Sequence, residues 1–354
     1  MAVLRKGRGA GSNDEGRFES RSIEKVDDGW QREEEPLPSF ETIVRTVQAK
    51  SVLTRNESPD IGFDQSINPY LGCEHGCIYC YARPSHGYLN LSAGLDFETR
   101  LFVKANAADV LEAELRRRSY RPVFTMIGAN TDCYQPIEKQ HRVTRGILEV
   151  LTRFRHPVGI ITKGTLIERD LDLLADLARD QLVTVGITLT TLEPALKRTL
   201  EPRAASPDAR LRVMRKLADI GVPVRVMFSP VIPFVNDAEL ERVLEAGRDA
   251  GATSASYVLL RLPHEVKDLF RDWLQTHAPL KAAHVMSLIN QSRGGKDYDS
   301  GFGTRMKGEG AFADLIAQRY RLACRRLGLD RPRFTPRCDL FRVPAAGGQA
   351  ELGF

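Results

Sequence analysis

Short apolar runs and amphipathic stretches alternate through the middle of the chain. Each run is rich in β-branched residues, which predicts a buried strand, and is followed by a segment of period near 3.6, which predicts a helix. The predicted strands lie at residues 101–104, 122–128, 158–162, 182–189, 222–228 and 255–260. The predicted helices between them lie at residues 107–118, 137–154, 165–179, 206–220 and 237–250. This alternation predicts an α/β fold of parallel strands joined by right-handed crossovers.

Two architectures fit such a series of strand–helix units: a doubly wound sheet and a partial barrel. The glycine-rich dinucleotide fingerprint follows none of the predicted strands, which weakens the first. In barrels the functional side chains gather at the carboxyl ends of the strands, so candidate residues are sought there.

The pattern changes toward both ends of the chain. Residues 1–38 are charged and glycine-rich, so they bury little apolar surface and predict a mobile arm. Residues 39–262 carry the alternating pattern, after a strand-like start at 42–54. Residues 263–354 predict a helical C-terminal extension, with helices at 264–276, 280–290 and 312–327. The glycine-rich loop 292–303 interrupts these helices and is expected to cover or approach a substrate.

Composition places the protein among ordinary globular chains. Its 354 residues suffice for one large domain with a full core, and its net charge of +5 permits nucleic-acid binding without demanding it. No run approaches the roughly 18–20 apolar residues of a membrane span, and the first 40 residues lack the apolar core of a signal peptide. We therefore expect no membrane partner. Six cysteines in a chain of this length make a poor disulfide framework, and unpaired thiols suit a reducing, cytoplasmic compartment.

Three of the six cysteines lie in one stretch, residues 68–83 (NPYLGCEHGCIYCYAR), at the spacing C-x3-C-x2-C. Thiolates are soft ligands for iron, and Cys73, Cys77 and Cys80 can each take one iron of a cubane cluster. The fourth iron would stay open for a second molecule. The alternative is a zinc site with His75 or His86 as fourth ligand, but structural zinc loops more often use two C-x2-C pairs. No second pair follows here.

The sequence around these cysteines resembles the radical S-adenosylmethionine (radical SAM) enzymes, with Tyr79 as the aromatic residue before the third cysteine. The resemblance implies that Cys73, Cys77 and Cys80 ligate a 4Fe-4S cluster whose open iron chelates S-adenosylmethionine, with Tyr79 near the adenine. It implies reductive cleavage to a 5′-deoxyadenosyl radical and a reductant such as flavodoxin or ferredoxin. It also favours the partial (β/α)6 barrel, with the cluster at its open top.

Two motifs resemble the branch related to spore photoproduct lyase, a DNA-repair enzyme. These are Asn-Pro-Tyr-Leu-Gly-Cys, ending at Cys73, and Asp-Cys-Tyr-Gln-Pro-Ile-Glu, at residues 132–138. The branch implies a nucleic acid as substrate. A peptide or small metabolite is the alternative substrate class, and a zinc-stabilised nucleic-acid-binding module without catalysis is the alternative to an enzyme.

The first group of candidate cofactor ligands follows the predicted strand 122–128. Radical SAM enzymes often hold the cofactor's amino group there with Gly-Gly-Glu, which this chain lacks. Asn130, Thr131 and Asp132 are therefore its expected substitutes, although Asp132 can equally cap the loop.

Further candidate ligands follow the next three strands. Lys163 can pair with the cofactor carboxylate or be an ordinary loop lysine. Arg203 can hold a carboxylate through two hydrogen bonds or pair with Glu201 or Glu193. The remaining cofactor candidates are Thr190 and Ser229, the latter at a proline-stiffened loop suited to lining the adenine.

Cys133 and Tyr134 are candidate catalytic residues. The resemblance implies a cysteine near this strand that returns hydrogen to the product radical, and Tyr134 is a rival relay. The alternative for a lone cysteine is a small, inert core residue.

Arginines alternate with aromatic residues near the C-terminus, at 319–326 and 331–342. They predict either phosphate and base contacts or a solvated helix face with a docked tail.

Overall fold

The computed structural model describes residues 7–14, 17–18, 41–330 and 334–345. Its main sheet contains six parallel strands, ordered in space as they are along the chain. They are β3 (Gln65–Ile67), β6 (Thr125–Ile127), β7 (Val158–Thr162), β8 (Val183–Thr188), β9 (Val224–Val231) and β10 (Ser254–Leu259). A seventh strand, β2 (Thr54–Arg55), pairs antiparallel with β3. Because the order never reverses and β3 does not pair with β10, the sheet forms the predicted partial barrel, open on one side.

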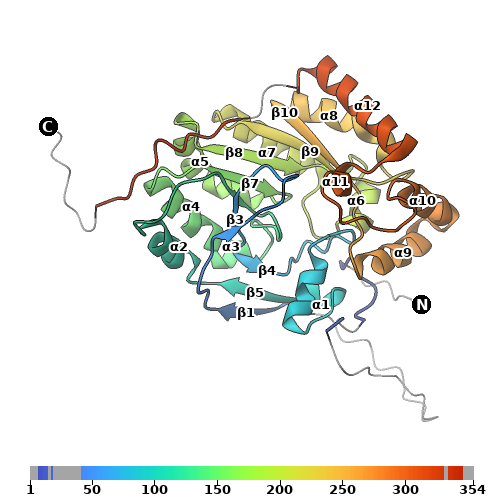
Figure 1. The fold of residues 1–354 in the computed structure, drawn as a ribbon, viewed down its shortest axis with the longest axis horizontal. Coiled ribbons are helices and arrows are strands. Elements are labelled where there is room, and N and C mark those ends of the chain that lie inside the picture. The colour runs from blue at the N-terminus through green and yellow to red at the C-terminus, as the bar shows by residue number, and fades with distance from the viewer. Residues whose placement is uncertain (1–6, 15–16, 19–40, 331–333, 346–354) are drawn as a thin grey trace, which may run out of the picture.

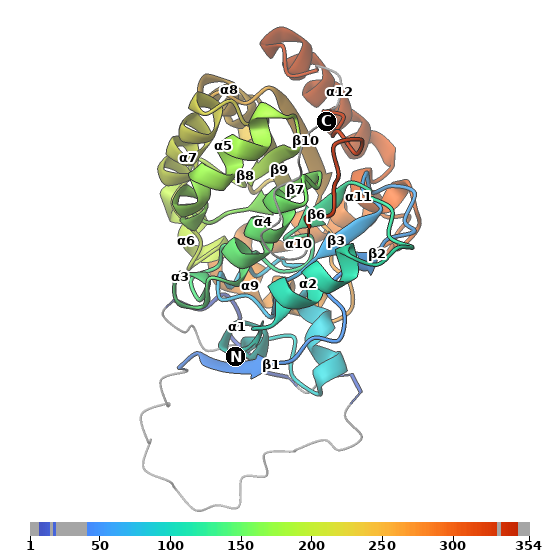
Figure 2. The same ribbon diagram turned by 90° about the vertical axis from the view of Figure 1, so that its left-hand side faces the viewer.

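Helices cover the outer face of this sheet, as Figure 2 shows for α4, α5, α7 and α8. Besides η1 (Arg83–Leu89) and α1 (Leu95–Thr99), the helices between the barrel strands are α2 (Ala107–Leu115), α3 (Glu138–His141), α4 (Val143–Arg153), η2 (Leu166–Asp170), α5 (Leu171–Arg179), α6 (Pro194–Leu200), α7 (Pro207–Asp219), η3 (Asp237–Glu239) and α8 (Leu240–Asp249). Helix α7 begins where Ser206 caps it by accepting a hydrogen bond from the Ala209 amide. Sequence analysis did not predict the short α6.

Strand β9 shows how the sheet divides the outer core from the barrel interior. Val226 faces outward, since a side chain at Gly247 of α8 would meet it at 2.7 Å. The next residue, Met227, faces inward, where a side chain at Gly186 of β8 would lie 2.7 Å from its sulfur. Small residues therefore leave room inside the barrel, while the apolar core fills the layer between strands and helices.

The first predicted strand, residues 101–104, is not part of the barrel. It forms β5 (Arg100–Lys104), which pairs with β1 (Ile43–Val47) and β4 (Tyr70–Leu71) in a separate three-stranded sheet, below the main sheet in Figure 1. The first barrel position belongs instead to β3. Three residues give too short a pattern to recognise, and strand pairing depends on partners distant in the sequence.

The C-terminal helices are α9 (Val266–His277), α10 (Pro279–Gln291), α11 (Thr304–Lys307) and α12 (Gly310–Leu327). They confirm the predicted helical extension, with α12 packed on α8 and β10. None of the helices in the described ranges is both long and apolar enough to cross a membrane.

Part of the predicted mobile arm is fixed. Residues 7–14 lie against α1 (Leu95–Thr99), where the Leu95 amide donates to Ser12 O and Asn13 exchanges hydrogen bonds with Asp96. Composition predicted mobility because the segment is polar. Its polar groups instead form hydrogen bonds with residues more than 80 positions away in the sequence. Of the remaining residues of 1–38, only 17 and 18 are within the described part.

Two aromatic residues of the basic C-terminal segment, Tyr320 and Phe341, pack against the core. Phe341 lies against Tyr120, Phe154 and His156, and the Arg342 amide donates to Phe154 O. Tyr320 packs on Tyr257. These contacts correspond to the docked-tail interpretation.

Acid is expected to destabilise the fold through His156. Burial lowers the pKa of His156 to about 4, from an ordinary value of 6.5. The unfolded chain therefore binds a proton between pH 6.5 and 4 that the folded chain does not. Above pH 6.5 the imidazole is neutral in both states, so it does not lower the free energy of unfolding. As the pH drops to 4, protonation of the unfolded chain lowers that free energy by about 3 kcal/mol.

Denaturant unfolding of the wild type and of His156→Phe at several pH values measures this loss. The variant is expected to show a shallower loss between pH 6.5 and 4. Equal slopes for the two proteins would show that His156 is not its source.

Candidate cofactor site at the barrel mouth

The three motif cysteines lie in the loop between β4 and η1 (Arg83–Leu89), which we call the cluster loop (residues 72–82). Cys73 and Cys77 are buried and Cys80 is half-buried. Burial raises the pKa of Cys73 well above its usual value, and negative charge on Asp132, Cys77 and Cys80 adds to the effect. The thiols therefore lie close enough to repel one another when ionised, and a metal that binds them must displace their protons.

Positive charge faces this loop from the barrel. Burial, followed by the nearby Glu201 carboxylate, raises the pKa of Cys77 to about 12, while Lys163 and Arg210 oppose the rise. These cations favour thiolate at Cys77.

A buried ion pair beside Cys77 holds the cluster loop in place. Arg83 donates to Cys77 O at 2.9 Å and pairs with Glu98 at 2.5 Å. The other donors to the Glu98 carboxylate are the amides of Gly9 and Ala10, at 2.9 and 2.8 Å. Glu98 thus ties the N-terminal segment to the cysteines.

Gly76 permits the close approach of the loop to Glu98. Its φ is +66°, and a side chain there would lie 2.6 Å from the Glu98 carboxylate. Only glycine combines that backbone conformation with that contact.

The cluster loop also carries Tyr79, whose hydroxyl donates to the buried carboxylate of Glu201. Glu201 also accepts from Thr190 Oγ1 at 2.7 Å and pairs with Arg210. Although burial raises the pKa of Glu201, Arg210 and Lys163 lower it to about 2. The Lys163 ammonium lies 5.9 Å from the centre of the Tyr79 ring. The structure thus brings together three predicted residues, Tyr79, Thr190 and Lys163.

Sequence analysis missed the roles of Glu201 and Arg210. Glu201 was considered only as a partner of Arg203. A signal for Arg210 did exist: it shares the helical face of α7 with Val213, Met214 and Leu217, all of them buried. An arginine in an apolar stripe needs a buried partner.

Asp132 occupies the point where β6, β7 and the cluster loop meet. It accepts from Thr162 Oγ1 at 2.6 Å, the Lys163 amide at 2.7 Å and the Tyr134 amide at 2.9 Å. His75 Nδ1 lies 3.3 Å from its carboxylate. Burial opposes ionisation, but His75 and these hydrogen bonds lower the pKa of Asp132. Its contacts are those of a residue that joins strand ends.

The other two residues of this group have different surroundings. Thr131 is buried and donates to Tyr70 O at 2.9 Å. The Asn130 amide donates to Asn68 Oδ1 at 2.9 Å, and the residue is half-exposed.

Arg203 and Ser229 are the remaining predicted cofactor ligands. Arg203 pairs with Glu74 at 2.7 Å, and neither Glu201 nor Glu193 is its partner in an ion pair. The Ser229 carbonyl accepts from Thr190, and the buried Ser229 hydroxyl has no hydrogen-bond partner among the described residues.

Cys133 and Tyr134 are directed into the core. The Cys133 sulfur is buried 3.9 Å from Ile161 O, and the Cys133 carbonyl accepts from Thr144 of α4. The Tyr134 hydroxyl donates to Asp170 at 3.0 Å. The structure therefore does not group these two side chains with Tyr79, Thr190 and Lys163.

The donor set fits an iron–sulfur cluster better than a zinc ion. Both candidate fourth zinc ligands have other neighbours: His86 Nε2 lies 2.9 Å from Arg100 O, and His75 faces Asp132. The described residues contain no group of three or more His, Cys, Asp or Glu arranged to hold one metal ion. A cubane cluster needs no such convergence, because each thiolate binds a different iron.

Comparisons with known proteins agree with this geometry. The family model described as the radical SAM superfamily matches residues 67–247. An uncharacterized protein of Mycobacterium tuberculosis (strain H37Rv) is 38% identical over 260 residues, covering 72% of this chain and 76% of that protein. An uncharacterized protein of Methanocaldococcus jannaschii is 30% identical over 194 residues, covering 54% and 69%.

Solved structures of spore photoproduct lyase share the fold. The complex with dinucleoside spore photoproduct has a TM-score of 0.59 at 13% identity, covering 80% of this chain and 79% of that one. A variant with bound AdoMet and the same dinucleoside has a TM-score of 0.59 at 15% identity, covering 80% and 78%. The family-model match spans just over half of the chain and includes all three cysteines. The chain therefore belongs to the radical SAM superfamily.

Proposed function

We propose that this enzyme binds a 4Fe-4S cluster through Cys73, Cys77 and Cys80 and uses it with S-adenosylmethionine, reduced by a protein such as flavodoxin or ferredoxin. The observation that carries the proposal is the cluster loop itself, with three thiols at the mouth of a partial barrel facing Lys163 and Arg210. When bound, the two cofactors supply a 5′-deoxyadenosyl radical that abstracts hydrogen from the substrate.

The side chains around Tyr79 have the chemistry to hold S-adenosylmethionine. Tyr79, fixed through its hydroxyl by Glu201 and Thr190, offers a ring face to the adenine. Lys163 offers a cation to the cofactor carboxylate, and the unpartnered Ser229 hydroxyl offers a hydrogen bond.

The predicted residues that do not surround Tyr79 would mostly position other parts of the site. Asp132 and Thr131 would position the β6 end for the half-exposed Asn130, which would meet the amino group of the cofactor. Arg203, paired with Glu74, would support the cluster loop.

A nucleic acid is the substrate class that we propose, in a lyase-like repair or a modification. Support comes from the two motifs shared with the spore photoproduct lyase branch and from the fold shared with that lyase, one structure of which holds a dinucleoside. The net charge of +5 is compatible with a polyanion.

Anaerobic reconstitution followed by dithionite reduction with S-adenosylmethionine tests the proposal. The expected result is about four irons and four sulfides per chain, with 5′-deoxyadenosine formed. DNA carrying the dinucleoside spore photoproduct, unmodified DNA and RNA are then compared as stimulants of 5′-deoxyadenosine formation.

Two results would contradict parts of the proposal. One zinc without sulfide would support the zinc-stabilised module instead. If the protein binds a full cluster and cleaves S-adenosylmethionine, but no nucleic acid changes the rate of 5′-deoxyadenosine formation, the substrate is a peptide or small metabolite instead.

A further inference from the structure

Aromatic and cationic side chains gather beside the cluster loop, on a surface that the cofactor site does not use. We define this cation–aromatic surface as Tyr81, Arg261, Tyr298, Phe302 and Arg305. Tyr81 follows Cys80 directly, and Arg261 follows the carboxyl end of β10, so both belong to the barrel mouth. The other three residues lie in or just after the glycine-rich loop 292–303. Tyr81 is 45% exposed and Phe302 is 61% exposed.

Arg261 connects the cluster loop to the glycine-rich loop. Its guanidinium lies 5.1 Å from the centre of the Tyr81 ring and 6.0 Å from that of Tyr298, and it donates to the Tyr298 hydroxyl at 3.2 Å. The Tyr81 hydroxyl donates to Ala129 O, which fixes that ring at the end of β6. Arg261 Nε is buried without a hydrogen-bond partner in the described part of the chain. Because that nitrogen is buried, a ligand would meet the guanidinium at its terminal nitrogens, on a residue that is half-exposed.

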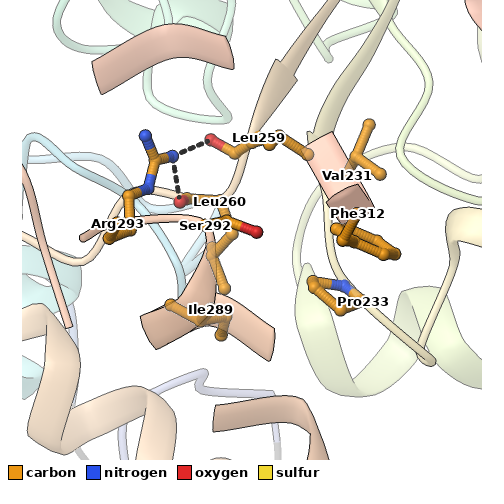
Figure 3. A pocket seen from close by; sticks show the side chains of 8 residues that line it. All are labelled: Val231, Pro233, Leu259, Leu260, Ile289, Ser292, Arg293 and Phe312. Atoms are coloured by element: carbon orange, nitrogen blue, oxygen red, sulfur yellow. Dashed lines mark hydrogen bonds between the residues drawn. The ribbon is translucent and has the colours of Figure 1, made fainter. Parts of the chain in front are cut away.

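The glycine-rich loop is held firmly enough to present these groups. Arg293, only 3% exposed, donates to Leu259 O and Leu260 O at the end of β10, as Figure 3 shows beside a small pocket. Its other guanidinium nitrogen donates to Thr304 O and Arg305 O. The loop is thereby fixed to the last barrel strand.

Arg305 links the two edges of the open barrel. It pairs with Asp60 through two hydrogen bonds of 2.6 and 2.5 Å, and Asp60 lies in the segment between β2 and β3. The same guanidinium lies 4.8 Å from the centre of the Phe302 ring. A cation and an exposed ring are therefore set side by side across the open side of the barrel.

We propose that the cation–aromatic surface binds an unpaired stretch of nucleic acid and guides it to the cluster. The exposed faces of Tyr81 and Phe302 would stack on bases, and Arg261 would contact a backbone phosphate. This inference rests on the substrate class proposed above. An acidic reductant protein could also pair with the arginines. Two exposed aromatic rings beside them are better suited to stacking on planar bases, so the combination favours a nucleic acid.

Fluorescence anisotropy with a fluorescein-labelled single-stranded oligothymidylate, on the reconstituted protein without S-adenosylmethionine, tests this inference. Phe302→Ala is expected to weaken binding about tenfold and leave its salt dependence unchanged, because it removes stacking alone. Arg261→Met is expected to weaken binding and to lower the slope of log affinity against log salt by about 0.7, the value for one phosphate contact on a single strand. Phe302 is largely exposed, so its truncation leaves the core intact.

Arg325→Met is the matched control. It removes the same charge from an exposed position in α12, within the basic C-terminal segment. Its affinity is expected to stay within about twofold of the wild type. If Arg325→Met weakens binding as much as Arg261→Met does, the interface belongs to the C-terminal helix and the inference is overturned.

Two further outcomes separate this inference from the proposed function. If Phe302→Ala and Arg261→Met weaken oligonucleotide binding but the wild type never cleaves S-adenosylmethionine, the inference about the cation–aromatic surface is supported and the proposed radical reaction is rejected. Normal oligonucleotide binding by both surface variants, with slower reduction by flavodoxin, would make the surface a docking site for the reductant and overturn the inference.

Discussion

Replacement of Cys77 with alanine is expected to lower the iron bound after reconstitution from about four atoms per chain to near zero. Two thiolates remain in the variant, and they cannot anchor three irons of a cubane cluster. The formation of 5′-deoxyadenosine should fall to background with the iron. Iron and sulfide analysis, together with the electron paramagnetic resonance signal of the reduced protein, measures the change.

Cys338→Ala is the matched control, because Cys338 is a half-buried cysteine outside the cluster loop. It is expected to bind the same iron as the wild type and to cleave S-adenosylmethionine at the same rate. If Cys77→Ala retains a full complement of iron and sulfide, the assignment of the three ligands is wrong.

Replacement of Arg83 with methionine is expected to destabilise the metal-free protein by about 3–5 kcal/mol, because it removes the guanidinium that pairs with the buried Glu98 carboxylate. Both side chains of the pair are 0% exposed. The variant also loses the hydrogen bond from Arg83 Nε to Cys77 O, so the cluster loop should loosen and reconstitute poorly. Urea unfolding followed by circular dichroism measures the stability.

Two companion variants show whether the buried charge is the cause. Arg83→Met combined with Glu98→Leu should recover part of the lost stability, since the buried carboxylate is then gone. Arg100→Ala breaks an ion pair with Asp96, four residues earlier in α1, and the Arg100 side chain is 50% exposed, so it should cost no more than about 1 kcal/mol. A loss for Arg83→Met as small as that for Arg100→Ala would contradict the buried-pair argument.

The features that the sequence predicted correctly are those encoded locally. The cysteine motif is contiguous, and the strand–helix alternation repeats within short windows, so the superfamily resemblance and the parallel α/β architecture followed from them. Strands β7, β8, β9 and β10 lie where their apolar runs predicted them. The resemblance then selected the barrel over the doubly wound sheet.

The features that it missed depend on partners distant in the sequence. Whether the run at 101–104 joins the barrel is decided by pairing with β1 and β4, which its own pattern does not encode. Glu201 and Arg210 matter because the fold carries Tyr79 to them from more than 120 residues away. Residues 7–14 are ordered because Glu98 accepts the amides of Gly9 and Ala10.

The cluster loop lies between β4 and β5 of the small sheet, together with η1 and α1, and this attachment makes nearby backbone amides reporters of cluster retention. The chain leaves the barrel at β3, joins the small sheet at β4, and continues to Cys73, whose amide donates to Phe97 O at 3.0 Å. The Lys104 amide likewise donates to Pro69 O at 3.1 Å. Opening of the small sheet together with α1 would break both hydrogen bonds without unfolding the barrel, so the two amides belong to one local unit of stability. Their deuterium uptake should slow when the cluster is bound, and it would distinguish detachment of this unit from global unfolding.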